Sequence, residues 1–223
     1  MAQRTIRVLA WSEMTEPTSV YPQGINGALA DHLNTCGGIT ARTAQIGDPD
    51  QGASKAALAE ADVLLWFGHK RHGDVSDETV ARVVEAVKDR GMGYLALHSS
   101  HFAKPLKALL GTTCAWRAYV ADGKPGRILI AAPDHPIALG VESFVIPNEE
   151  WYGEPYAVPT PEAIIVAGVY NDDTELARDG LVWTVGKGRV MYFRPGHETY
   201  PIFYMPPVRK LMENAVRWLA RAA

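Results

Sequence analysis

Short apolar runs alternate with amphipathic stretches over the first hundred residues. Candidate strands cover residues 5–11, 39–46, 62–68 and 92–97, and the continuous apolar runs of the last two predict strands buried on both faces. The clearest helix between them places Val80, Val83 and Val87 on one face, with Ser76 as its N-cap. Because strands that alternate with helices form parallel sheets covered on both faces, we predict a three-layer, doubly wound α/β fold with a mostly parallel sheet.

The second half of the chain is richer in strands. Candidate strands cover residues 128–132, 163–168, 181–185 and 189–193. Gly186-Lys187-Gly188 predicts a hairpin turn between the last two. A closing amphipathic helix is predicted to begin at Pro206-Pro207. No linker or shift of composition divides the chain, so we expect a single domain over residues 1–223.

Charge and cysteine content narrow the functional class. The 223 residues include 22 basic and 25 acidic side chains, a net charge of −3 that predicts no nucleic-acid partner and no membrane partner. No apolar run approaches the roughly 20 residues that span a bilayer, and the N-terminus has no signal-peptide core. The distant Cys36 and Cys114 suggest neither a metal motif nor a disulfide framework, so we expect a cytoplasmic protein. A homo-oligomer stays open.

Polar side chains directly follow four of the predicted strands. In an open parallel sheet, ligands bind beyond the carboxyl ends of the strands. The segments at those ends are Trp11-Ser12-Glu13, Gly68-His69-Lys70-Arg71-His72, His98-Ser99-Ser100-His101 and Arg194-Pro195-Gly196-His197-Glu198. We therefore predict that they meet at one edge and form the functional site.

The histidines of this edge suggest two kinds of chemistry. Imidazole and carboxylate groups bind zinc and similar ions, so a divalent metal, with zinc as the first candidate, is one expectation. Its predicted ligands are His69, His98, Glu150 and His197. The same side chains suit general acid/base catalysis, for which we predict His98, Glu150 and His197. The alternative for His69 and His72 is a solvated position beside Lys70 and Arg71.

Several other residues have a simpler interpretation. Ser99 and Ser100 are expected to cap the following helix, because the glycines that a serine-hydrolase elbow needs are absent around Ser99. His135 lies between two prolines and is expected to hold a rigid turn. The chain has neither a phosphate-binding loop nor a dinucleotide fingerprint, so no nucleotide cofactor is expected.

Aromatic and charged residues near the predicted edge favour a sugar ligand. Aromatic faces stack on the C–H surfaces of sugars, and charged groups bond to hydroxyls. The predicted substrate-binding residues are Trp11, Glu13, Tyr21, Trp151, Tyr152 and Arg194. A small-molecule sugar is therefore the expected partner. The alternative for one residue of the Glu149-Glu150 pair is a solvated acidic turn.

Taken together, these motifs resemble the ThuA-like (trehalose utilisation) family across nearly the whole chain. The segments that carry the resemblance are Trp66–His69 with His72, Leu97-His98-Ser99, Asp134–Ile137, Glu149-Glu150 with Tyr152, Gly186–Glu198 and Asn214–Trp218. The resemblance implies the fold of class I glutamine amidotransferases and a role in sugar catabolism that involves 3-keto-sugars. Those amidotransferases carry a nucleophilic cysteine at the tip occupied here by His98 and Ser99. We therefore expect no glutamine amidotransferase activity.

Two functions remain open from the sequence. The first is an enzyme of sugar catabolism, such as a keto-sugar hydrolase, lyase or isomerase that works by metal-assisted or acid/base chemistry. The second is a non-catalytic sugar-binding or regulatory module that keeps the amidotransferase-like fold, and the missing cysteine motivates it. A weaker third idea is an amidotransferase that uses Cys114.

Overall fold

A nine-stranded sheet forms the centre of the molecule, in the order β2-β1-β3-β4-β11-β10-β9-β6-β7. The computed structural model describes residues 4–221. Its parallel half consists of β2 (Ile39–Gln45), β1 (Ile6–Ser12), β3 (Val63–Phe67), β4 (Gly93–Leu97) and β11 (Gly188–Phe193). Every residue of β3 and β4 is buried, as their continuous apolar runs predicted.

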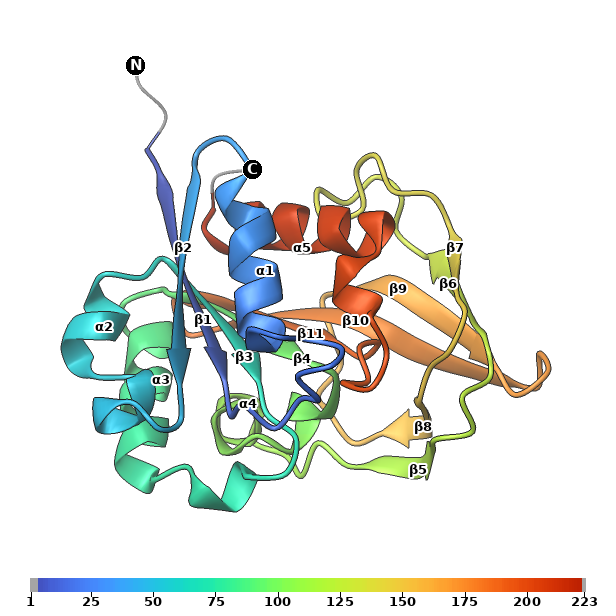
Figure 1. Cartoon of the computed structure of the whole chain (residues 1–223), viewed down its shortest axis with the longest axis horizontal. Coiled ribbons are helices and arrows are strands. Elements are labelled where there is room, and N and C mark those ends of the chain that lie inside the picture. The colour runs from blue at the N-terminus through green and yellow to red at the C-terminus, as the bar shows by residue number, and fades with distance from the viewer. Residues whose placement is uncertain (1–3, 222–223) are drawn as a thin grey trace.

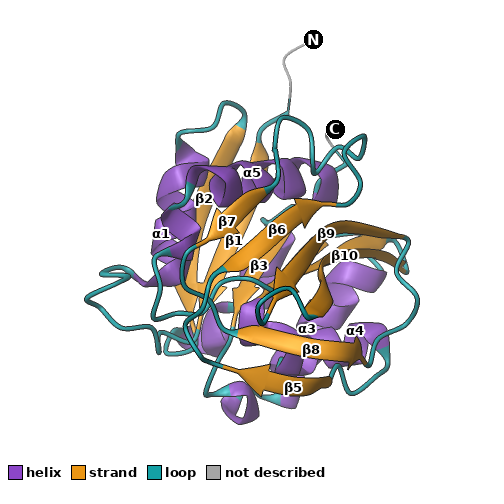
Figure 2. Ribbon diagram, turned by 90° about the vertical axis from the view of Figure 1, so that its right-hand side faces the viewer, coloured by secondary structure: helices purple, strands orange, loops and turns teal. Residues whose placement is uncertain are grey.

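Helices cover both faces of this sheet (Figures 1 and 2). They are α1 (Gly24–Asn34), α2 (Lys55–Ala59), α3 (Asp77–Lys88), α4 (Lys104–Leu110) and α5 (Pro206–Leu219). Helices α1 and α5 pack on one face, and α2, α3 and α4 on the other. The Ser76 hydroxyl accepts the Thr79 N–H and caps α3, as predicted. The three-layer α/β fold is confirmed.

The other half of the sheet is antiparallel. It contains β10 (Glu175–Val185), β9 (Ala163–Tyr170), β6 (Gly126–Ile130) and β7 (Phe144–Ile146). The predicted hairpin at residues 186–188 joins β10 to β11, with Val185 paired to Gly188. Strand β10 begins six residues before the predicted position at 181, because the polar segment 175–180 pairs with β9 despite its low apolar content.

A separate two-stranded sheet lies beside the main one (Figure 2). It pairs β5 (Trp116–Val120) with β8 (Trp151–Tyr156) in antiparallel fashion. Neither strand was predicted, since Gly153 and Pro155 in β8 are poor strand formers. In Figure 1 these strands lie at the lower side of the molecule, toward which the arrowheads of β1 and β2 point. The small sheet therefore lies at the carboxyl edge of the parallel strands.

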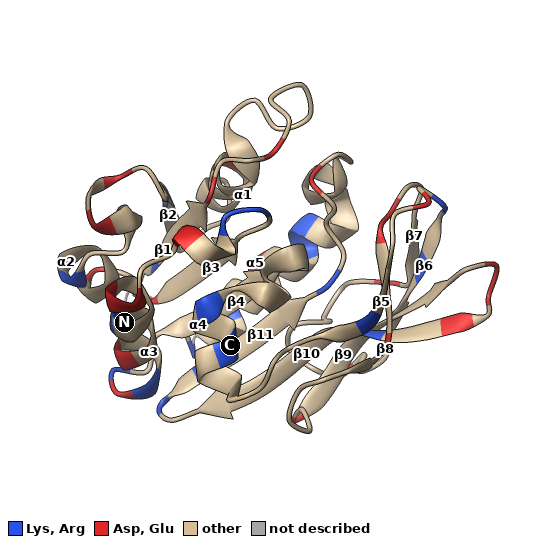
Figure 3. Ribbon diagram, turned by 90° about the horizontal axis from the view of Figure 1, so that it is seen from below, with Lys and Arg blue, Asp and Glu red and all other residues tan. Residues whose placement is uncertain are grey.

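Among the described residues, no helix is both long enough and apolar enough to cross a bilayer. Seen toward the carboxyl edge, charges of both signs are scattered around the periphery (Figure 3).

Candidate functional site

His98 occupies the tip of β4 in a conformation that few non-glycine residues adopt. Its φ is +48°, in the left-handed region, where the chain turns from β4 into a short 3₁₀ segment, η3 (His98–Phe102). Such backbone strain costs about 1–3 kcal/mol and clusters at functional sites. The imidazole Nδ1 lies 2.7 Å from the carbonyl oxygen of Arg194. Because a carbonyl only accepts, Nδ1 carries a proton and Nε2 faces the rest of the site.

Glu150 and Tyr152 complete a compact group around His98 Nε2. The Glu150 Oε2 atom lies 3.0 Å from Nε2, and the Tyr152 hydroxyl lies 2.9 Å from Nε2 and 3.1 Å from the same carboxylate oxygen. Burial raises the pKa of Glu150, but the hydrogen bond and charge of His98 outweigh it and lower the pKa to about 2. Burial, followed by the Glu150 charge, raises the pKa of Tyr152 well above its usual range. Tyr152 is therefore a neutral hydrogen-bond donor beside an ionised carboxylate.

A second histidine and carboxylate extend the group into a row. His197 Nε2 lies 3.7 Å from Glu150 Oε2, and His197 Nδ1 lies 3.7 Å from Glu198 Oε2. At the far end, His69 Nδ1 lies 3.1 Å from Glu198 Oε1. Burial and the neighbouring His98 lower the pKa of His197, so its imidazole is neutral at neutral pH. The structure thus brings together all four residues that we predicted as metal ligands.

Glu149, the neighbour of Glu150, has a structural role. Its fully buried carboxylate accepts the backbone N–H groups of Gly196 at 3.1 Å and of Glu150 at 3.0 Å. Burial raises its pKa. Gly196 has a φ of +134°, and a Cβ there would lie 2.5 Å from the Phe203 ring, so only glycine fits. Glu149 therefore fixes the backbone that presents Glu150 and His197.

Arg194 also acts inside the protein. Its guanidinium forms a fully buried ion pair with Asp179, with Nη2 2.9 Å from Oδ2, and Nη1 donates to the Glu150 carbonyl at 3.0 Å. Burial lowers its pKa to about 10, which leaves it charged at neutral pH. The structure places Arg194 behind the site, where it orients Glu150, and not in an open position for a sugar hydroxyl. Asp179 was not among the residues predicted from the sequence, where its only signal is a carboxylate next to the apolar run of β10.

Glu13 and the two serines hold the loop that carries His69. The Glu13 carboxylate accepts the backbone N–H groups of Lys70 and Arg71. The Ser99 hydroxyl donates to the Gly68 carbonyl at 2.8 Å, and the Ser100 hydroxyl donates to the Trp66 carbonyl at 3.0 Å. The expectation that the serines cap the next helix was wrong, since α4 has no side-chain N-cap bond. Glu13, predicted to bind a hydroxyl, is likewise turned inward.

The four aromatic residues predicted as sugar walls are all buried. Trp11 stacks on Trp66 with ring centroids 3.7 Å apart, and its indole N–H donates to the Gln51 carbonyl. The Tyr21 hydroxyl donates to the Tyr200 carbonyl at 2.7 Å. The structure therefore places Trp11 and Tyr21 in the core and not on an open wall. Trp151 stacks beside Tyr170, and Tyr152 belongs to the proton-sharing group.

The predicted zinc ligands do not fit a metal as they are placed. Within residues 4–221, no three His, Cys, Asp or Glu side chains converge in a way that could hold a metal ion. His98 has both ring nitrogens engaged, Nδ1 by the Arg194 carbonyl and Nε2 by Glu150 and Tyr152. We therefore derive no reaction step from a metal.

Other histidines and the cysteine have separate roles. The His135 Nδ1 accepts the Ile137 N–H at 3.2 Å, which confirms its part in the turn. His101 is buried, and burial lowers its pKa to about 3. His72 is half-buried, and its Nε2 has no hydrogen-bond partner among residues 4–221. Burial raises the pKa of the Cys114 thiol, the opposite of what a nucleophilic thiolate needs.

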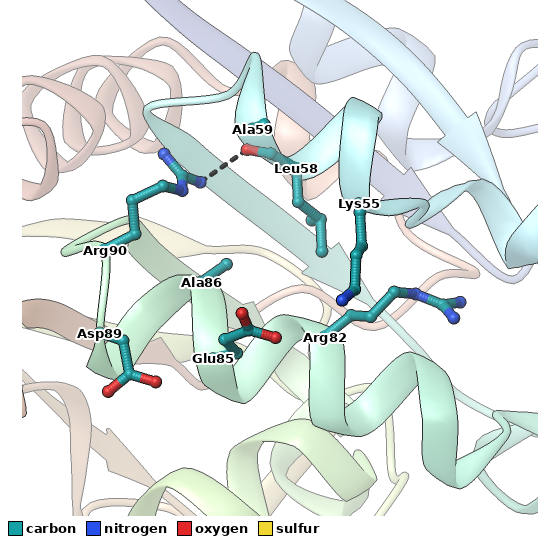
Figure 4. A pocket seen from close by; sticks show the side chains of 8 residues that line it. All are labelled: Lys55, Leu58, Ala59, Arg82, Glu85, Ala86, Asp89 and Arg90. Carbon is teal, nitrogen blue, oxygen red and sulfur yellow. Dashed lines mark hydrogen bonds between the residues drawn. The ribbon is translucent and has the colours of Figure 1, made fainter.

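A pocket of about 370 Å³ lies between α2 and α3 (Figure 4). Its lining residues are Lys55, Leu58, Ala59, Arg82, Glu85, Ala86, Asp89 and Arg90. Arg90 donates to the Leu58 and Ala61 carbonyls, and Arg82 donates to the Ala53 carbonyl. Because both guanidinium groups close the two ends of α2, this pocket is a feature of helix packing.

Comparison with known proteins agrees with this architecture. The sequence model of the ThuA family, described as "Trehalose utilisation", matches residues 7–219. No curated protein matches the sequence.

Solved structures share the fold at low sequence identity. A ThuA-like protein from Bacteroides uniformis is 17% identical with a TM-score of 0.69, and the match covers 98% of this chain and 93% of that one. A ThuA-like protein from Parabacteroides merdae is 14% identical with a TM-score of 0.70, over 97% and 90% of the two chains. A protein described as a GMP synthase subunit from Thermoplasma acidophilum is 10% identical with a TM-score of 0.59, over 99% and 96%.

These likenesses support the amidotransferase-like fold and nothing finer. The family model, in contrast, spans nearly the whole chain, including every residue of the row from His98 to His69. The chain therefore belongs to the ThuA family, whose described role is trehalose utilisation.

Proposed function

We propose that this ThuA-family protein is an enzyme that acts on a sugar or keto-sugar of a trehalose-related pathway by general acid/base chemistry. One observation carries the proposal: the contact among His98, Glu150 and Tyr152 on a strained strand tip. The lowered pKa keeps Glu150 ionised and the raised pKa keeps the Tyr152 hydroxyl protonated, so the two hold the His98 imidazole by hydrogen bonds in a fixed position. Membership of the family supports a trehalose-related role.

The row of side chains provides two proton-transfer groups with different properties. The Arg194 carbonyl fixes the ring orientation of His98 through its Nδ1 proton, whereas the neutral His197 faces Glu150 from the other side. One group can remove a proton next to a sugar carbonyl while the other delivers a proton to the oxygen. This pairing suits an isomerase or a lyase that acts on a keto-sugar. It also suits a hydrolase, in which the base removes a proton from water and not from a sugar carbon.

The enclosure of His98 favours a second candidate, a sugar-binding or regulatory module. The His98 side chain is 0% exposed, and the Glu150 side chain is 17% exposed. A ligand would therefore contact Glu150 and His197 first, and binding without turnover would satisfy the same geometry.

Solvent deuterium exchange distinguishes the two candidates. We expect the protein to incorporate deuterium next to the carbonyl of 3-keto-glucose or 3-keto-trehalose in D₂O, as measured by NMR. Glu150→Gln and His98→Gln should reduce the rate at least a hundredfold, since general acid/base groups contribute about 10²–10⁴-fold. The control His32→Gln, on α1, should retain the wild-type rate. Binding of these sugars without deuterium exchange would reject the proposed enzyme and support the sugar-binding module.

A further inference from the structure

One aromatic ring next to the acid/base group is exposed, while the neighbouring rings of His101 and Tyr152 are buried. Tyr119 of β5 is 43% exposed. It pairs directly with Tyr152 across the small sheet, and the two ring centroids are 5.1 Å apart. Tyr152 is in turn hydrogen-bonded to Glu150 and contacts His98. A single aromatic ring therefore separates Tyr119 from the proton-sharing atoms.

The Tyr119 ring is held in place from behind. It stacks on His101 with centroids 5.6 Å apart and an interplanar angle of 20°, and on Phe102 at 5.7 Å and 29°. Its hydroxyl accepts the Trp116 N–H at 3.1 Å. A ring that is fixed in this way loses little conformational entropy when a ligand covers it. The exposed part of Tyr119 is thus a preorganised flat surface.

Tyr119 lies close enough to the site for the Glu150 charge to act on its phenol. Burial, and after it the Glu150 charge, raises the pKa of Tyr119, which keeps the phenol neutral and its ring available for stacking. The Lys107 ammonium lies 4.8 Å from the centre of the Phe102 ring, which itself stacks on Tyr119. Aromatic surface next to polar groups is the composition that a sugar ring requires, because its C–H faces are apolar and its hydroxyls are not.

We propose that Tyr119 forms a second sugar subsite, which stacks on the ring adjacent to the one that meets Glu150 and His197. This inference rests on the proposed function, because it takes the acid/base group as the position of the reacting ring. Tyr119 acts as a specificity-determining residue that favours two-ring glycosides over free monosaccharides. It has no part in proton transfer.

Calorimetric titration with trehalose, glucose and their 3-keto derivatives tests the subsite. Tyr119→Ala should weaken binding of the disaccharides by roughly two- to tenfold, the size of effect that one aromatic stacking contact has. It should leave the monosaccharides unchanged. Tyr119→Phe keeps the ring face and should bind disaccharides like the wild type. Leu176→Ala, at a 63% exposed position on β10, is the control for loss of exposed apolar surface.

The outcomes separate this inference from the proposed function. Equal weakening of both sugar classes, an unchanged affinity for disaccharides, or no binding of any of these sugars by the wild type would each overturn the subsite. If the protein also catalyses deuterium exchange, Tyr119→Ala should raise KM for 3-keto-trehalose and leave kcat unchanged. A selective loss of disaccharide binding without any exchange would keep the subsite and reject the enzyme.

Discussion

Glu150 is the residue on which most of the site's electrostatics converge. Its carboxylate lies within 3.7 Å of His98, Tyr152 and His197, while its backbone is fixed by Glu149 and Arg194. The neighbouring Glu149 has the opposite pKa shift, because it is fully buried and bonded only to backbone amides, which do not supply a full positive charge. Two adjacent glutamates therefore have different tasks that their sequence neighbourhood does not reveal.

Glu150→Gln tests the lowered pKa of Glu150 through the stability of the fold at acidic pH. The Glu150 pKa of about 2 in the folded state lies below the value of about 4.3 for a free glutamate. The carboxylate therefore stabilises the fold above pH ~4.3, and this contribution is lost as the pH falls toward 2. We expect the free energy of unfolding in urea to fall more steeply between pH 5 and pH 2 in the wild type than in Glu150→Gln. The exposed Glu142→Gln is the control, and parallel curves for all three proteins would contradict the assignment.

At the scale of elements, the packing of α5 on β4 depends on a missing side chain. A Cβ at Gly93 would lie 2.6 Å from the Leu219 Cβ, closer than such atoms approach in proteins. The first residue of β4 thus allows α5 to lie directly on the strand that ends at His98.

Gly93→Ala should destabilise the protein by about 1–3 kcal/mol, because the added methyl overpacks this contact. The matched control is Gly37→Ala, where a Cβ meets nothing within 4 Å and the backbone is unstrained. The free energies of unfolding in urea measure both effects. Equal stability of the two variants would show that α5 shifts freely and that the close approach has no cost.

At the scale of the whole molecule, β11 joins the parallel and antiparallel halves into one sheet. It pairs with β4 on one side and with β10 on the other. The site takes residues from both halves, since His98 follows β4 while Asp179 lies on β10 and Glu150 precedes β8. Both halves must therefore be folded together for the acid/base group to form.

This arrangement predicts a single cooperative unfolding transition, consistent with the expected single domain. Urea unfolding followed by far-UV circular dichroism and by tryptophan fluorescence should give coincident midpoints. Tryptophans occur in both halves, with Trp11 and Trp66 in the parallel half and Trp183 on β10 in the antiparallel half. Two separated midpoints would show that the halves fold as independent units.

The sequence by itself determined the buried strands, the capped helix α3, the closing helix and the edge at which the histidines gather. Those features depend on local periodicity and on the rule that parallel strands share an edge. Trp11 and Tyr21 were predicted to contact a sugar but are buried in the core. An aromatic residue at a strand end or in a loop looks the same in sequence whether it is buried or exposed. The exposed Tyr119 was missed for the same reason.

Only the tertiary structure decided which side chains meet. His98 and Glu150 are 52 residues apart, and their 3.0 Å contact exists because β8 folds back beside the tip of β4. It also decided that Glu149, Arg194 and Glu13 turn inward, where backbone amides or an opposite charge offset the cost of burying them. A linear sequence shows which groups are available for chemistry, whereas long-range packing sets their distances and hence their proton affinities.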